Sequence, residues 1–185
     1  IFAVVDGEKL PFGNVDLSGL GDLTGERAVR LDEKGGHHAI PHENINGTIK
    51  INSRNFENIL ITHRVPEPFV DVEDKHWFKG DVEDAYNYVF TKGTGGANYS
   101  PFASITRGEF AVLIARALEL KPDGSSEQFK DIDGKWYASE AQALRDAGIV
   151  NGFVDGTFGG NKTITRQEAA TMLVNMLKYA GMDTT

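Results

Sequence analysis

Residues 105–110 read Ile-Thr-Arg-Gly-Glu-Phe, and residues 164–169 read Ile-Thr-Arg-Gln-Glu-Ala. In both segments a Thr is followed three positions later by a Glu, and an apolar pattern of helical spacing begins there. A Thr at the N-cap and a Glu at the third helical position form a capping box, in which each side chain bonds to the other residue's backbone N–H. We therefore predict helices that begin directly after Thr106 and Thr165, each cap contributing about 1 kcal/mol.

These segments belong to an internal repeat, in which residue n aligns with residue n+59. Such a register is typical of a duplicated supersecondary unit. With a gap of one residue, the alignment extends upstream, where Phe69-Val70-Asp71-Val72 matches Phe129-Lys130-Asp131-Ile132. Further matched pairs are Trp77 and Trp136, Gly93 and Gly152, Tyr99 and Phe158, Glu109 and Glu168, and Leu118 and Leu177.

Apolar residues at helical spacing predict two helices in each repeat, joined by a loop. Lys121-Pro122-Asp123-Gly124 predicts the break between the repeats. The stripes are Val82, Ala85, Tyr86, Val89 and Phe90, then Phe110, Leu113, Ile114, Ala117 and Leu118, then the weaker set Ala141, Leu144, Gly148 and Ile149, and finally Ala169, Met172, Leu173, Met176 and Leu177.

The region before the repeats differs, because it holds short β-type runs separated by Gly and Asn or Asp, including Asn46-Gly47. We predict an α+β chain: a small antiparallel β unit at 1–65, which ends a longer extracellular region, then repeats at 66–125 and 126–185. Val65-Pro66-Glu67-Pro68 is the expected linker. The β-type runs lie at 1–5, 27–31, 47–51 and 58–62.

Composition excludes several classes of function. The net charge of −8 argues against nucleic acid as a partner, since that affinity comes from clustered Lys and Arg. No apolar run approaches the ~20 residues that span a bilayer. The chain has no Cys, which excludes disulfides and thiolate metal sites. His37, His38 and His42 do not have the pattern of a metal site, so we expect no metal and no cofactor.

Arg107 and Arg166 each follow the capping Thr directly. The N-terminus of a helix carries partial positive charge, so a cation there is mildly unfavourable. Its occurrence at both equivalent positions suggests an anion site made of the Arg and unpaired backbone N–H groups. The alternative is that each Arg pairs with a neighbouring acid, such as Asp71 or Asp131, and only braces the fold.

Phe-x-Asp-Val/Ile, then Trp, then a Gly-rich loop that ends in Ile-Thr-Arg-x-Glu before an apolar helix resembles the S-layer-homology repeat. The resemblance covers about 69–180 and is closest over 147–158 in the second repeat. The loop at 91–99 lacks the Asp-Gly pair of the family pattern. The resemblance implies an all-helical, pseudo-threefold bundle of three repeats, of which this chain has two, so self-association would complete the bundle.

The resemblance also implies non-covalent anchoring to the bacterial cell wall, outside the cell, through a secondary wall polysaccharide that often carries a pyruvate ketal. It makes Arg107, Arg166, Asp71, Asp131, Gly93 and Gly152 candidate ligand-binding residues, with Trp77 and Trp136 as either sugar contacts or core residues. No catalytic motif is present, so we predict no enzyme activity. Two alternatives remain: the chain anchors a larger polysaccharide hydrolase, or its repeats mediate protein–protein assembly.

Overall fold

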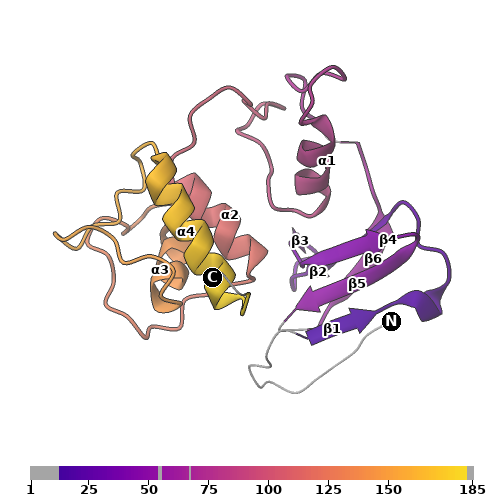
Figure 1. The fold of residues 1–185 in the computed structure, drawn as a ribbon, viewed down its shortest axis with the longest axis horizontal. Coiled ribbons are helices and arrows are strands. Elements are labelled where there is room, and N and C mark those ends of the chain that lie inside the picture. Colours follow the sequence, from indigo (N-terminus) through magenta and orange to yellow (C-terminus); the bar gives the residue numbers. More distant parts are fainter. Residues whose placement is uncertain (1–12, 54–55, 67, 183–185) are drawn as a thin grey trace. The chain divides into compact units, whose positions relative to one another are not determined.

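The computed structural model describes residues 13–53, 56–66 and 68–182 (Figure 1). The chain divides at Phe102 into two compact units. This division falls inside the first repeat, so the two helices of that repeat belong to different units. None of the described helices combines the length and the apolar character that a bilayer-spanning segment requires.

Two three-stranded antiparallel sheets form the β part of the first unit, which confirms the predicted mixed α and β class. Ala28, Ile40, Ile49 and Ile51 form a buried core. Along β5, buried Ile49 and Ile51 alternate with exposed Lys50 and Asn52, so one face of its sheet is polar. The strand orders are β1 (Gly13–Asp16), β5 (Thr48–Ser53), β4 (His42–Ile45), and β3 (His37–His38), β2 (Glu26–Leu31), β6 (Ile59–His63).

The predicted runs at 27–31, 47–51 and 58–62 fall on β2, β5 and β6. The run at 1–5 lies outside the described residues. Asn46 and Gly47 join β4 to β5 with φ values of 51° and 77°, the left-handed conformation that a tight hairpin turn requires. Sequence analysis missed β1, β3 and β4, which have two to four residues each and are too short to show alternation, and the short 3₁₀ helix η1 (Ser18–Leu20).

The end of helix α1 (Lys79–Asn87) and the residues that follow it contact the β part of the same unit. Buried Val29, Ala39 and Val89 form one apolar cluster there. The fully buried Asn87 accepts from the N–H of Val65 at 2.9 Å and donates to its carbonyl at 2.8 Å, while Arg27 donates to the Asn87 carbonyl at 2.7 Å. The segment at Val65, predicted as a linker, is therefore fixed to α1.

The apolar stripe predicted a helix through Phe90, which is wrong because α1 ends at Asn87. Tyr88 is the C-cap, and Val89 adopts a left-handed φ of 61°. Helix α3 (Ala138–Asp146) likewise ends before Gly148, whose φ is 70°. In both cases the apolar pattern continues because a residue beyond the helix, Val89 or Ile149, is buried by packing. Periodicity alone does not distinguish this from a longer helix.

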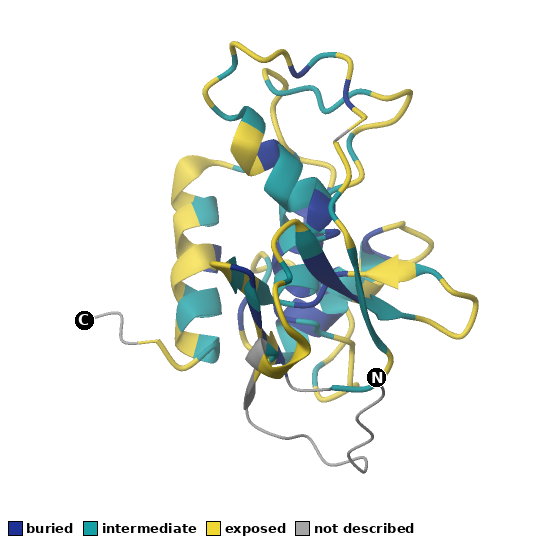
Figure 2. Cartoon of the chain, turned by 90° about the vertical axis from the view of Figure 1, so that its right-hand side faces the viewer, coloured by how far each residue is buried: buried dark blue, intermediate teal, exposed yellow. Residues whose placement is uncertain are grey.

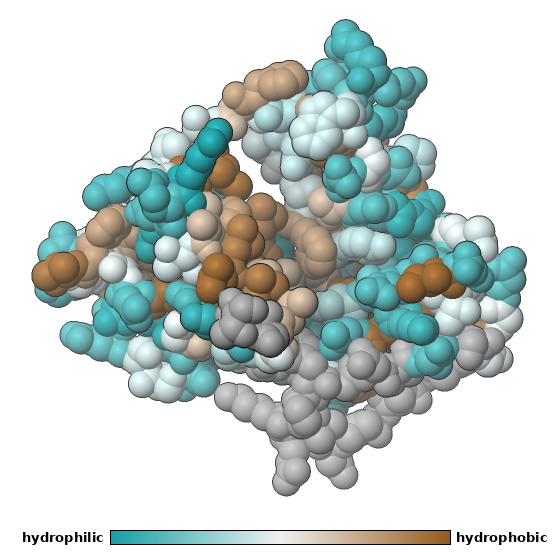
Figure 3. Space-filling model, viewed as in Figure 1, coloured by the Kyte–Doolittle hydropathy of each residue, from teal (hydrophilic) through white to brown (hydrophobic). Residues whose placement is uncertain are grey.

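Helices α2 (Arg107–Ala117), α3 and α4 (Arg166–Tyr179) make up the second unit. Among these helices, α2 and α3 carry most of the buried residues, whereas Met172 is the one buried residue of α4. Figure 2 shows the outer side of α4 exposed, and Figure 3 shows hydrophobic surface on this helical cluster. Leu173 and Val174 are each 41% exposed. One face of α4 is thus apolar but not covered by the described residues.

Candidate functional site

Both predicted capping boxes are confirmed. The Thr106 hydroxyl accepts from the Glu109 N–H at 3.2 Å, and the Thr106 N–H donates to the Glu109 carboxylate at 2.7 Å. The second box repeats this arrangement, with distances of 3.3 and 2.8 Å between Thr165 and Glu168. The boxes fix the starts of α2 and α4 and thereby place Arg107 and Arg166 at the first position of each helix.

The start of α2 is hydrogen-bonded to the loop of the second repeat. The backbone N–H groups of Arg107 and Gly108 donate to the carbonyls of Lys162 and Gly160, each at 2.8 Å, and the Ile164 N–H donates to Ile105 at 3.1 Å. A Cβ at Gly108 would lie 2.6 Å from the Tyr137 ring, so only glycine fits there. The repeat-2 loop therefore uses the free N–H groups at the start of α2.

The Arg107 side chain lies buried in the junction between the repeats. Its exposed fraction is 8%, and one guanidinium nitrogen lies 3.2 Å from the Glu168 carboxylate. Its guanidinium carbon lies 5.3 Å and 5.2 Å from the ring centroids of Phe153 and Phe158. The brace hypothesis suggested Asp71 or Asp131 as the partner of Arg107, but the partner is Glu168. Sequence reasoning missed Glu168 because its capping role explained that residue already.

The Glu168 carboxylate takes part in both the second capping box and the ion pair with Arg107. It accepts from the Thr165 N–H and hydroxyl with one oxygen and faces Arg107 with the other. The hydrogen bonds from the Thr165 N–H and hydroxyl, and then the charge of Arg107, lower the pKa of Glu168. Burial lowers the pKa of Arg107, and the Glu168 charge opposes that effect.

Arg166 has different surroundings, although the repeat makes it equivalent to Arg107. Its side chain is exposed and forms no ion pair with any residue in the described part of the chain. Lys162, four residues earlier in the sequence, is also exposed, with its ammonium nitrogen 4.6 Å from the Phe153 ring centroid. The two arginines thus divide into one buried, paired cation and one accessible cation.

Asp71 and Asp131 hold the loops of their own repeats. The two oxygens of Asp71 accept from the N–H groups of Tyr99 and Ser100 at 2.8 and 2.7 Å. Asp131 binds the N–H groups of Phe158 and Gly159 in the same way, at 2.6 and 2.8 Å. The hydrogen bond from the Tyr99 N–H is the main reason that the pKa of Asp71 is lowered.

Gly93 and Gly152 occupy tight positions with φ values of 74° and 75°. An added Cβ would collide with the Phe69 ring at Gly93 and with the Phe129 ring at Gly152. Each glycine therefore lets the loop cross the Phe of its own Phe-x-Asp segment. The described contacts of these glycines, like those of the two aspartates, are with the chain itself.

Trp77 and Trp136 lie at the surface, with exposed fractions of 88% and 64%. This exposure rules out the core alternative for both. Trp77 lines a groove of about 330 Å³ together with Phe78, Asp81, Val82, Tyr99 and Pro101. Phe102, which sequence analysis did not single out, is 82% exposed and adds an aromatic ring near Phe78.

The model of the S-layer homology domain matches residues 68–111 and 128–170. The chain carries two S-layer homology domains. Among its relatives are an endoglucanase of Bacillus sp. (strain KSM-635), 37% identical over 60% of this chain, and the endo-1,4-beta-xylanase A of Thermoanaerobacterium saccharolyticum, 32% identical over 61%. The surface-layer 125 kDa protein of Lysinibacillus sphaericus is 35% identical over 56%.

The chain spans only 12%, 10% and 9% of the lengths of these three relatives. The shared segment is therefore a small module within proteins that otherwise differ. Relatives of this chain that carry S-layer homology domains include surface-layer proteins, which supports a place at the cell surface.

We predict that Gly152→Ala destabilises the second S-layer homology domain more than Gly148→Ala. Both glycines have left-handed φ values, but an added Cβ meets Phe129 at Gly152 and open space at Gly148. Strain alone costs about 1–2 kcal/mol, and overpacking adds about 1–3 kcal/mol. Urea unfolding of both variants measures the difference, and equal losses would show that the Phe129 contact adds nothing.

We also predict that Glu168→Gln costs more stability than Glu109→Gln, because only Glu168 joins a capping box to a buried Arg. The excess should be about 1–3 kcal/mol. Since the folded pKa of Glu168 is lowered, its contribution is present above the unfolded pKa and is lost as pH falls through the folded pKa. We expect the extra loss of stability in Glu168→Gln, relative to Glu109→Gln, to decrease when urea unfolding is measured from about pH 7 down to about pH 3. An extra loss that stays constant over this range would contradict the ion pair.

Proposed function

We propose that this chain holds a surface protein on the bacterial cell wall by binding an acidic wall polysaccharide without a covalent bond. The observation that carries the proposal is the exposure of Trp77 and Trp136 at equivalent positions of the two domains. Each ring meets the neighbouring aromatic residue edge-on but stays mostly exposed, and its free apolar face suits the C–H face of a sugar ring while its N–H can donate.

The accessible cation for an acidic sugar is Arg166 in this proposal, and Arg107 is the brace that joins the domains. Arg166 is exposed at a helix start, where anions are favoured. Its planar guanidinium can hold a carboxylate, such as a pyruvate ketal, with two parallel hydrogen bonds. Asp71, Asp131, Gly93 and Gly152 contribute by shaping the loops of their own repeats.

The chain itself is proposed to be non-catalytic. The endoglucanase and xylanase relatives favour one setting for it, in which the domains anchor a polysaccharide hydrolase whose catalytic part lies elsewhere in a longer chain. The surface-layer relative favours another, in which they anchor a structural protein and the same surfaces contribute to assembly of the layer. Both settings use the same wall-binding site.

We predict that Arg166→Ala weakens binding of pyruvylated wall polysaccharide by about tenfold or more, because a charge-assisted contact contributes about 1.5–3 kcal/mol. Arg166→Lys should restore little, since an ammonium lacks the planar fork. Lys178→Ala, an exposed cation near the other end of α4, is the matched control and should bind normally.

Titration calorimetry with circular dichroism as the folding check measures these affinities. Arg107→Ala should mainly lower stability, and any folded fraction should still bind through Arg166. If Arg166→Ala and Arg107→Ala both bind as tightly as the unmodified chain, the arginines are structural only and the proposed mechanism is wrong.

We further propose that a second copy of the chain covers the apolar face of α4. The domain family implies three repeats in one bundle, and Leu173 and Val174 leave such a face uncovered by the described residues. Sedimentation equilibrium should show association that Leu173→Glu abolishes. A monomer at every concentration tested would refute this part of the proposal.

A further inference from the structure

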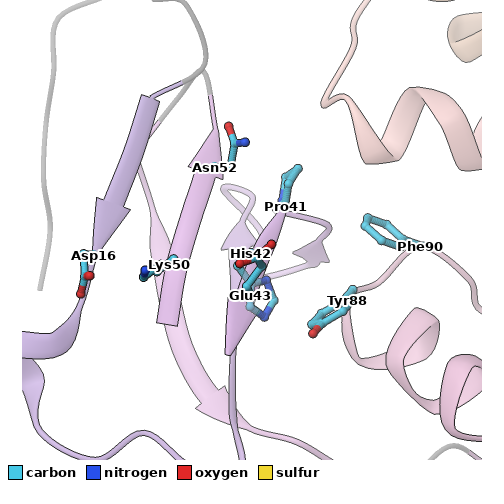
Figure 4. Close-up of a pocket in the computed structure, with 8 residues that line it drawn as sticks. All are labelled: Asp16, Pro41, His42, Glu43, Lys50, Asn52, Tyr88 and Phe90. Atoms are coloured by element: carbon cyan, nitrogen blue, oxygen red, sulfur yellow. The ribbon is translucent and has the colours of Figure 1, made fainter. Parts of the chain in front are cut away.

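A second pocket, of about 560 Å³, lies within the first unit and away from the residues assigned above (Figure 4). Its volume is within the range of about 300–1,000 Å³ that is usual for small-molecule sites. The lining combines the polar face of the β1-β5-β4 sheet with the segment that follows α1. The residues are Asp16, Pro41, His42, Glu43, Lys50, Asn52, Tyr88 and Phe90.

The sheet side of the pocket is a row of alternating charges. Lys50 on β5 lies opposite Asp16 on β1 and opposite Glu43 on β4, so the three side chains share one face. All three are exposed, as is Asn52 two residues farther along β5. Glu43, Lys50 and Asn52 form no side-chain hydrogen bond or ion pair with other described residues, which leaves their polar atoms available.

The other side of the pocket consists of aromatic rings, and contacts with neighbouring side chains fix the position of Tyr88. The Tyr88 and His42 rings meet edge-on, with their centroids 4.5 Å apart. The guanidinium carbon of Arg64 lies 5.8 Å from the Tyr88 ring centroid. His42 is neutral in this arrangement, because its Nε2 accepts from the Ala28 N–H at 3.1 Å and its Nδ1 donates to the Ile40 carbonyl at 2.9 Å. Burial is the main cause that lowers the pKa of His42, which keeps it neutral.

The backbone that presents this aromatic wall is strained. Val89, between Tyr88 and Phe90, has a φ of 61°, which is a genuine outlier for a β-branched residue. The second domain has Gly148 at the equivalent position, where the same conformation costs little. Strain of this kind persists only where the surroundings enforce it, and it is concentrated at binding sites. Here the packing of Val89 against Val29 and Ala39 enforces it.

From this geometry we infer that the pocket binds a neutral oligosaccharide. A pyranose chain offers apolar C–H faces to Tyr88 and Phe90 and hydroxyl groups to Glu43, Lys50 and Asn52. With the carboxylate of Glu43 beside the single ammonium of Lys50, the lining has no excess positive charge to attract an acidic sugar. An apolar peptide is also disfavoured, because Pro41 is the one aliphatic side chain in the lining. This site is distinct from the proposed wall-polysaccharide site and does not depend on it.

Titration calorimetry of the full chain tests the inference with two probes. Cellohexaose represents polysaccharide outside the wall, and hexa-N-acetylchitohexaose represents the sugar backbone of the wall itself. At least one should bind with a Kd below about 1 mM, and an oligogalacturonate of the same length should bind more weakly. Failure of both neutral probes, or tighter binding of the acidic one, would overturn the inference.

Variants locate the site. The double change Glu43→Gln and Asn52→Ala alters only exposed side chains and should weaken binding by about tenfold or more. Glu33→Gln, at an exposed turn outside the pocket, is the matched control and should bind like the unmodified chain. The double variant should keep full affinity for pyruvylated wall polysaccharide. Unchanged hexasaccharide binding by the double variant would show that the sugar binds elsewhere and would overturn the inference.

Discussion

The junction between the two S-layer homology domains depends on the hydrogen bonds at the start of α2. Arg107 and Gly108 donate their backbone N–H groups to the carbonyls of Lys162 and Gly160, and Glu168 pairs with the Arg107 side chain. A helix start normally leaves such N–H groups free for caps, water or an anion. Because the neighbouring loop occupies them here, Arg107 is buried among aromatic rings. The equivalent Arg166 is exposed, so one duplicated motif has two physical roles.

The two domains also have chemically different side chains at other equivalent positions. Asn87 and Asp146 both end the first helix of a domain and both hold the chain that precedes it: Asn87 through Val65, Asp146 through the N–H groups of Asp123 and Gly124. Val89 and Gly148 both follow these helices with left-handed φ values. The first domain uses the amide and the strained valine to pack against the β unit, and so α1 and the β strands form one compact unit.

The features that could be predicted from the sequence are those that depend on residues close together in the chain. The capping boxes fixed the starts of α2 and α4, and Asn46-Gly47 marked a hairpin turn. The end of α1 was not predictable, because Val89 and Phe90 continue a helical stripe although the β unit buries them. The aspartates and glycines of the repeat were recognised as important, but their contacts with loop amides and with Phe69 or Phe129 need coordinates. The difference between Arg107 and Arg166 depends on tertiary neighbours and has no local signal.

In the proposed mechanism, the accessible Arg166, and not the buried Arg107, meets the acidic ligand. Nuclear magnetic resonance of the arginine side-chain Nε–Hε groups tests it directly, because each guanidinium gives its own signal, assigned here by the Arg107→Lys and Arg166→Lys variants. On titration with pyruvylated wall polysaccharide, we predict a saturable shift of the Arg166 signal and little change for Arg107, which stays paired with Glu168. A large shift of Arg107 with Arg166 unmoved would contradict it.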